Sequence, residues 1–405
     1  MTETASVRHD GRPAAIPVRS IPIRSRLRLF FSIDIVGSTD FKHARNAPAA
    51  DPNSWVSPFL SFYQTSVNQI AVHWDRVVAE MSAVDPANAS GRFRFGSCPA
   101  FWKGAGDEVL FTKIVHSPLD AAAAVHAMLA VMQEHRLDQS QGRNLTIKGT
   151  AWLAGFPINN AEVILPRESA TPAQGALDDL VAENYRLLDL LEREPACKAD
   201  YNADYVGPSI DLGFRLCAHS TARQLIVSAD LAWLLCQAHL GCRPEEHQSC
   251  DYLRVPRLGY AGRVELKGIE GGEPYPLIWI EAEAATDFDR AEDRLLGSMP
   301  LADKPQHVED LKTFCATFLN GKGPLRTRPY IADCGDPEIG RVADGHDAAL
   351  RWLAAHVNGA AQQLASLPER DEEPGSGALP DALTQFAETV VSDQGAPPSQ
   401  GDTRK

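Results

Sequence analysis

The sequence predicts one α/β or α+β domain with a single sheet over residues 25–285. Apolar runs of strand length alternate with stretches of helical periodicity through this region. Residues 27–33 form a β-rich apolar run, and residues 118–135 form an alanine-rich helix that follows a serine and begins with a proline. The hydrophobic fraction of 44% and the charged fraction of 23% are those of a globular protein.

The other elements of this domain follow from the same patterns. A helix is expected from about residue 58, a hairpin over 93–115 that begins with a strand at 93–95, and a strand over 145–153. The polar stretch at about 157–203 has the composition of an insertion. The rest of the domain predicts helices at 210–219 and 229–238 and strands at 225–228, 264–267 and 277–280.

The two ends of the chain differ from this domain in composition. Residues 1–24 and 368–405 lack apolar periodicity, and we expect a disordered N-terminal arm and a disordered tail. Residues 286–367 show helical periodicity and predict a helical appendage.

Charge and cysteine content restrict the class of protein. The net charge of −14 argues against nucleic acid or a membrane surface as partner, because no basic excess exists to neutralise phosphates. No apolar run approaches the roughly 20 residues that span a bilayer. The eight cysteines include no C-x-x-C pair, which favours reduced thiols in the cytoplasm. Cys242, His247 and Cys250 are a weak metal-site candidate that lacks a fourth ligand.

Two acidic residues stand at the ends of predicted strands. Asp34 ends the strand at 27–33 and precedes a Gly-Ser-Thr turn, whereas Asp107 lies in a glycine turn before an apolar strand. Each alone is as readily a helix-capping turn or a solvated turn. If the two strands are neighbours, their carboxylates can share a pair of divalent cations.

Two later segments carry cations. A Gly-Pro break at 207–208 precedes a helix with Asp211 and Arg215 at i and i+4, which is equally the spacing of a surface ion pair. Lys267 precedes a glycine in a strand whose alternating charges also suit a solvent-facing edge.

In this order the four segments resemble the catalytic domain of class III adenylate and guanylate cyclases, over about 260 of the 405 residues. That family has a strand ending in F-x-D-I-x-G-S/T, then K-x-x-G-D, D-x-x-G-x-x-V-N-x-A-x-R, and a strand with lysine before glycine. The matching residues are Asp34, Ile35, Gly37, Ser38, Lys103, Gly106, Asp107, Asp204, Gly207, Arg215, Lys267 and Gly268.

The resemblance implies an α+β fold with a ferredoxin-like βαββαβ core and helices on one face of the sheet. It implies two Mn²⁺ or Mg²⁺ ions held by Asp34, Asp107 and the carbonyl of Ile35. By the same resemblance Arg215 acts on the α-phosphate, and Lys103 and Asp204 read the base. The phosphate-binding residues that it implies are Val36, Gly37, Ser38, Thr39 and Lys267.

In the family the site is shared between two subunits of a homodimer. The resemblance therefore implies that Asp34 and Asp107 come from one subunit and that the base-binding and phosphate-binding cations come from the other. One departure affects catalysis: Asp211 stands where the family has the asparagine that orients the ribose, and Phe214 replaces a small residue.

Further details resemble the bacterial pyrimidine cyclases of the Pycsar antiphage system. These are the D-I-V-G-S-T-x-F-K run at 34–42, Trp55 followed by Phe59 and Phe62-Tyr63, the turn at 104–108 and the G-P-S-I-D-x-G-F-R run at 207–215. Those enzymes make cyclic UMP or cyclic CMP, which activates a separate effector. A lysine donor and a carboxylate acceptor suit uracil, cytosine or adenine alike, and we favour UTP because cyclic UMP producers are the commoner members.

Other functions stay open at this point. A cytidylate or adenylate cyclase would use the same residues, and a domain that only binds nucleotide would keep the fold without turnover. A metal-dependent phosphodiesterase would need histidine-rich motifs, which the 12 histidines do not form. The activating signal, the role of the C-terminal helices and the effector cannot be inferred from the sequence.

Overall fold

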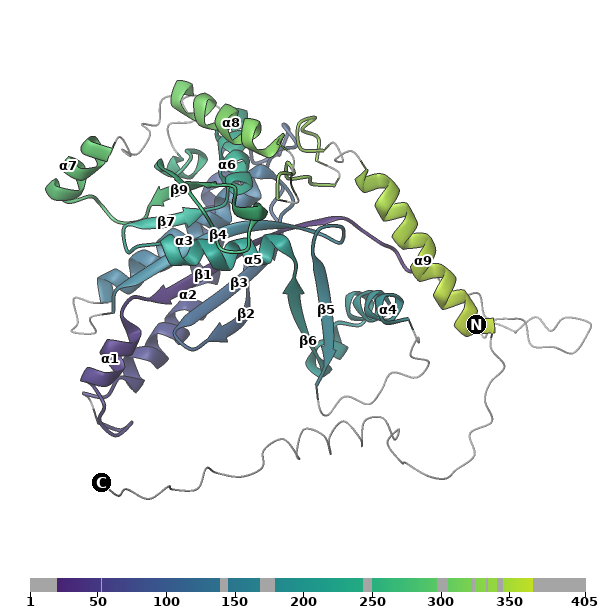
Figure 1. Cartoon of the computed structure of the whole chain (residues 1–405), viewed down its shortest axis with the longest axis horizontal. Helices are drawn as coiled ribbons and strands as arrows, with labels where there is room; N and C mark the ends of the chain where they lie inside the picture. The colour runs from purple at the N-terminus through teal and green to yellow at the C-terminus, as the bar shows by residue number, and fades with distance from the viewer. Residues whose placement is uncertain are drawn as a thin grey trace, which may run out of the picture. The chain divides into compact units, whose positions relative to one another are not determined.

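The strand β1, Arg26–Ile35, is an interior strand of a seven-stranded sheet whose order is β2-β3-β1-β4-β7-β9-β8 (Figure 1). The computed structural model describes residues 20–51, 53–138, 145–167, 179–242, 250–296, 305–321, 323, 325–332, 334–340 and 345–366. The other strands of this sheet are β2 (Ala100–Ala105), β3 (Glu108–Ile114), β4 (Ile147–Phe156), β7 (Gln224–Val227), β8 (Leu258–Val264) and β9 (Tyr275–Glu281).

The first four strands form a ferredoxin-like unit. The chain runs from β1 through α1 (Ser38–Ala44) and α2 (Val56–Ser82) to the hairpin β2-β3, and then through α3 (Pro118–Asp138) to β4. The strand order β2-β3-β1-β4, with antiparallel pairing throughout, is that of a βαββαβ core. The prediction of an α+β fold is therefore confirmed.

Alternation along β1 separates the two faces of the sheet. Leu29, Phe31 and Ile33 are fully buried against the helices α2, α3 and α6 (Ala229–Cys242) and form part of the main core. Successive side chains of a strand point to opposite faces, so Phe30, Ser32 and Asp34 point the other way. The predicted placement of the long helices on one face is confirmed, and it leaves Asp34 on the opposite face.

That opposite face is covered by aromatic residues and by α5, Pro208–Leu216. Phe30 stacks on Trp152 with ring centroids 5.6 Å apart, and Trp152 lies directly under Gly213 of α5. A Cβ atom at Gly213 would be 2.1 Å from the indole, so only glycine allows α5 to approach β4 this closely.

The predicted insertion forms an arm beside this face. It consists of β5 (Ala161–Pro166), α4 (Leu180–Arg193) and β6 (Tyr201–Val206), with β5 and β6 paired as a separate antiparallel sheet. The start of α4 is stabilised because the Asp179 side chain accepts hydrogen bonds from the backbone N–H groups of Val181 and Ala182.

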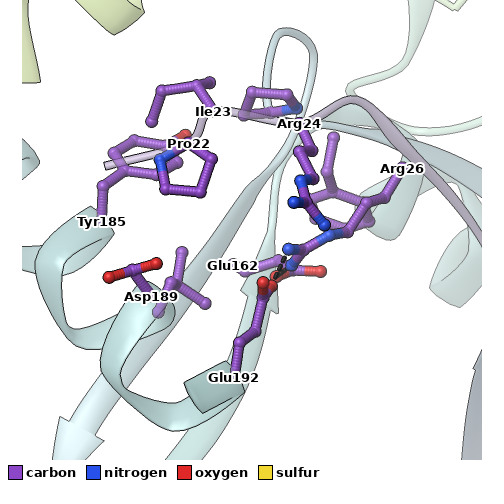
Figure 2. A pocket seen from close by; sticks show the side chains of 11 residues that line it. Pro22, Ile23, Arg24, Arg26, Glu162, Tyr185, Asp189 and Glu192 are labelled. Atoms are coloured by element: carbon purple, nitrogen blue, oxygen red, sulfur yellow. Dashed lines mark hydrogen bonds and ion pairs between the residues drawn. The ribbon is translucent and has the colours of Figure 1, made fainter. Parts of the chain in front are cut away.

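A cluster of charges holds the arm against β1. Arg26 of β1 forms ion pairs with Glu162 of β5 and with Glu192 of α4 (Figure 2). Arg28 of β1 also forms an ion pair with Glu162. Glu162 is only 6% exposed, whereas Glu192 is 39% exposed. Burial with two guanidinium groups makes Glu162 the centre of this cluster.

The described C-terminal helices are α7 (Asp287–Leu296), α8 (Pro305–Leu319) and α9 (His346–Ser366). The apolar side of α8 belongs to the main core, beside α6. On α9, the amide of Asn358 accepts a hydrogen bond from the N–H of Ile21 at 2.7 Å and donates one to its carbonyl at 3.2 Å. The remainder of the expected N-terminal arm and the expected tail lie outside the described residues.

Two predicted strand positions were wrong. The first strand of the hairpin is β2 at 100–105 and not residues 93–95, which have no regular structure. The strand expected at 264–267 is instead β8, which ends at Val264, and Lys267 and Gly268 form a turn in which Gly268 adopts a positive φ of 78°. Within the described residues no helix has the length and apolar character needed to span a membrane.

We predict that Glu162→Gln lowers the free energy of unfolding by about 3 kcal/mol, because it leaves the largely buried Arg28 guanidinium without its carboxylate partner and Arg26 with only the more exposed Glu192. Urea denaturation monitored by circular dichroism measures this change. The matched control is Glu192→Gln, which removes the more exposed carboxylate of the same cluster and should cost less than about 1 kcal/mol. Equal losses in the two variants would contradict the central role of Glu162.

Candidate active site

The structure brings Asp34 and Asp107 together. Asp34 is the ninth residue of β1 and is paired in register with Glu108, the first residue of the neighbouring strand β3. Asp107 lies in the β2-β3 turn, where Gly106 takes a positive φ of 73°, and its carbonyl accepts a hydrogen bond from the Ile35 N–H at 3.3 Å. The expectation that the two strands are neighbours is confirmed.

The two carboxylates influence each other electrostatically. Partial burial raises the pKa of Asp34; the ammonium of Lys148 lowers it, and the charge of Asp107 raises it further. The Asp34 side chain is 25% exposed, so it is reachable from solvent while being held by the sheet. Two oxygen ligands in such an arrangement suit a hard divalent cation.

A third acid, Glu108, lies on the same face. Its carboxylate accepts a hydrogen bond from the Ser32 hydroxyl and lies 3.9 Å from the Cys217 sulfur. Burial raises the pKa of Glu108, with Ser32 opposing the shift and Asp34 adding to it. Burial likewise raises the pKa of Cys217 to about 11, so this thiol stays protonated at neutral pH.

The predicted phosphate loop, Val36–Thr39, forms a tight turn into α1. Gly37 adopts a left-handed φ of 67°, and the Ser38 hydroxyl donates to the Asp107 carboxylate. The Val36 N–H already donates to the Thr146 carbonyl at 2.8 Å, so it belongs to the sheet. The N–H groups of Gly37, Ser38 and Thr39 are the ones that this turn can offer to an anion.

Lys103 and Asp204, which the resemblance predicts to contact the base together, form an ion pair. The Lys103 ammonium on β2 lies 2.9 Å from the Asp204 carboxylate on β6, and each side chain is about 40% exposed. Lys103 also lies over the Trp102 ring at 4.2 Å. The edge of Phe214 completes this aromatic surface, with its ring centroid 6.3 Å from that of Trp102.

The structure does not bring Arg215 or Lys267 to the carboxylates. Asp211 and Arg215 are exposed on α5 and form no ion pair with each other. Lys267 is exposed in the turn after β8. No hydrogen bond or ion pair links Arg215 or Lys267 to another residue in the described part of the chain, so both cations face outward.

Three contributors at this site were missed by sequence reasoning. Lys148 pairs with Asp34, Glu108 lies beside it, and the Tyr63 hydroxyl donates to the Gly106 carbonyl at 3.1 Å. The Tyr63 ring occupies the space that a Cβ atom at Gly104 would need. The Gly-x-Gly-Asp-Glu motif at 104–108 contains Gly104 and Glu108 and could have drawn attention to them. The local sequence around Lys148 does not indicate that Asp34 is its partner.

The donor set fits a pair of divalent cations that keep water and substrate oxygens as further ligands. Asp34, Asp107 and the Ile35 carbonyl supply hard oxygen donors from two adjacent strand ends. Within the described ranges no group of three or more His, Cys, Asp or Glu side chains is arranged to hold a metal ion, so the protein ligands here would be two carboxylates and a carbonyl. The Cys242, His247 and Cys250 candidate cannot be assessed as a whole because His247 lies outside them.

A cavity of about 470 Å³ lies elsewhere, between the start of α3, the end of α6, and α8. Arg92, Lys312 and Asp336 line it, together with Cys242 of the weak metal candidate, and it contains none of the residues predicted for the cyclase site.

Comparison with known proteins gives only distant similarity. No family model matches the sequence, and no curated protein matches it. Among solved structures, the adenylyl cyclase CyaB from P. aeruginosa is 15% identical with a TM-score of 0.39, covering 65% of this chain and 97% of that one. The guanylate cyclase domain of RhGC from Catenaria anguillulae, solved with GTP, is 12% identical with a TM-score of 0.33, covering 64% and 100%.

We expect Gly213→Ala to displace α5 and with it Arg215, because the new methyl group would overlap the Trp152 indole. Overpacking of this kind costs about 1–3 kcal/mol. Thermal unfolding followed by circular dichroism gives the change in stability. Gly241→Ala is the control, since a Cβ atom there meets open space on another helix, and a loss at Gly241 as large as that at Gly213 would count against the steric explanation.

Proposed function

We propose that this chain is a class III nucleotide cyclase that converts a nucleoside triphosphate to its 3′,5′-cyclic monophosphate and pyrophosphate. The observation that carries the proposal is the convergence of Asp34 and Asp107 at adjacent strand ends of a ferredoxin-like sheet. The Lys103–Asp204 pair beside the same sheet supports it, because it offers both a donor and an acceptor to a base.

Each residue then has a defined role in the reaction. Two Mn²⁺ or Mg²⁺ ions, held by Asp34, Asp107 and the Ile35 carbonyl, would supply Lewis acidity at the ribose 3′-hydroxyl and the phosphates. The 3′-oxygen forms a bond to the α-phosphorus, its proton passes to solvent, and the bond to the β-phosphate oxygen breaks. Arg215 offsets negative charge at the α-phosphate, Lys267 binds the outer phosphates, and Asp211 stands beside the ribose.

The proposed substrate is UTP. Uracil presents the O4 acceptor and the N3–H donor that Lys103 and Asp204 complement. Phe214 and Trp102 form a bulky aromatic surface next to this pair, which favours a small base over a purine. In this proposal cyclic UMP serves in the cytoplasm as an antiphage messenger for a separate effector.

The active unit is proposed to be a homodimer. Arg215 and Lys267 are exposed, and neither forms an ion pair with Asp34 among the described residues. Their exposure supports the proposal that a second copy supplies them. Each of the two sites would combine Asp34 and Asp107 of one subunit with the four base- and phosphate-binding side chains of the other.

Two other functions use parts of the same site. A cytidylate or adenylate cyclase would need the same donor and acceptor pair, and a non-catalytic nucleotide-binding domain would need only the fold. The exposed Arg215 and Lys267 favour catalysis over binding alone, because they have no described structural partner.

Incubation of the purified protein with each of the four ribonucleoside triphosphates and Mn²⁺ tests the substrate. We expect cyclic UMP and pyrophosphate from UTP, and a loss of turnover of at least about 10³-fold in Asp107→Asn. Turnover of ATP alone would replace the pyrimidine proposal with an adenylate cyclase. Activity in Asp107→Asn equal to that of the unmodified protein would reject the proposed site.

Mixing of variants tests the dimer. Asp34→Asn and Arg215→Ala should each be inactive alone, while their mixture should regain about a quarter of full activity. That fraction follows because half of the random dimers are mixed and each mixed dimer holds one intact site of two. If each site lay within one chain, the mixture would stay inactive.

A further inference from the structure

A lysine occupies the position opposite the first metal-binding carboxylate. Lys148 on β4 is the direct cross-strand neighbour of Asp34 on β1, and its ammonium nitrogen lies 3.3 Å from Asp34 Oδ2. The two side chains are 22% and 25% exposed. The strand register places these two side chains next to each other, because β1 and β4 pair without interruption over their whole length.

Lys148 also contacts the segment that follows α5. Its ammonium donates to the Cys217 carbonyl at 3.4 Å, just after α5. Asp34, Asp107 and Glu108 bring three carboxyl groups to this side of the sheet. Among the residues that the structure describes, Lys148 is the only lysine or arginine that forms an ion pair with any of them.

At this position the Lys148 ammonium would compete with a divalent metal ion for the Asp34 carboxylate. A divalent ion on Asp34 and the Lys148 ammonium seek the same oxygens, and like charges at this distance repel strongly where water is partly excluded. The four-carbon stem of lysine lets the ammonium move away when its carboxylate is taken. A bound triphosphate offers the displaced ammonium a new anionic partner.

We propose that Lys148 is a positioning residue that acts as the internal counter-ion of Asp34, so that divalent cations bind firmly only together with the triphosphate. The inference rests on the proposed function, because it assigns a metal to Asp34. It extends that function because Lys148 would weaken metal binding to Asp34 of the same subunit when no nucleotide is bound.

The test measures Mn²⁺ affinity and not turnover. Free Mn²⁺ is quantified by electron paramagnetic resonance during titration of the full chain without nucleotide. We expect Lys148→Gln to bind Mn²⁺ about tenfold more tightly, because the competing charge is gone. Lys148→Arg keeps the charge and should retain the original affinity. Lys198→Gln is the matched control, since it removes an equal charge from an exposed position in the 3₁₀ turn at 195–200, which carries none of the residues placed at the metal site.

The same titration with a non-hydrolysable UTP analogue gives a second readout. In the unmodified protein the analogue should raise Mn²⁺ affinity strongly, and in Lys148→Gln this increase should be smaller by the same factor of about ten. A merely structural lysine would leave this coupling unchanged.

Circular dichroism establishes that each variant is folded. Unchanged or weaker Mn²⁺ binding in folded Lys148→Gln would overturn the inference even if the protein cyclises nucleotides. Tighter binding in that variant, with no turnover of any nucleotide by the unmodified protein, would uphold the inference and reject the cyclase.

Discussion

The two-residue period of β1 is the constraint on which the rest of the structure depends. One set of its side chains is committed to the core under α2, α3 and α6, which fixes the register against β3 and β4. The other set, which ends in Ser32 and Asp34, must then face the opposite side. A slip of one residue would bury the carboxylate among apolar side chains, so core packing and the placement of the site are specified by the same alternation.

The arm extends this dependence to the Lys103–Asp204 pair, which we propose contacts the base. Asp204 lies on β6, outside the main sheet, and reaches Lys103 on β2. Its position depends on β5, which is paired with β6 and joined to β1 through Glu162 and two arginines. The strand that carries Asp34 therefore also anchors the segment that carries Asp204.

Local sequence patterns indicated a domain with one sheet and two acids at strand ends, and the resemblance to class III cyclases added the ferredoxin-like fold and the joint placement of Asp34 and Asp107. These patterns were insufficient for Lys148 and Glu162, whose roles depend on partners more than 100 residues away and on a register that no local pattern encodes. The misplaced strand at 93–95 has a similar cause. Phe93 and Phe95 have β-forming side chains, but they pack partly buried against the main core without joining a strand.

The two hydrogen bonds between Asn358 and Ile21 determine how this protein can be truncated. One amide side chain on α9 satisfies both polar backbone groups of a residue that lies five positions before β1. Shortening the chain from either direction would break the same two hydrogen bonds and uncover the same apolar contact between Ile21 and Val357. The segment before the sheet and the last described helix therefore form a single structural unit, although they lie at opposite ends of the sequence.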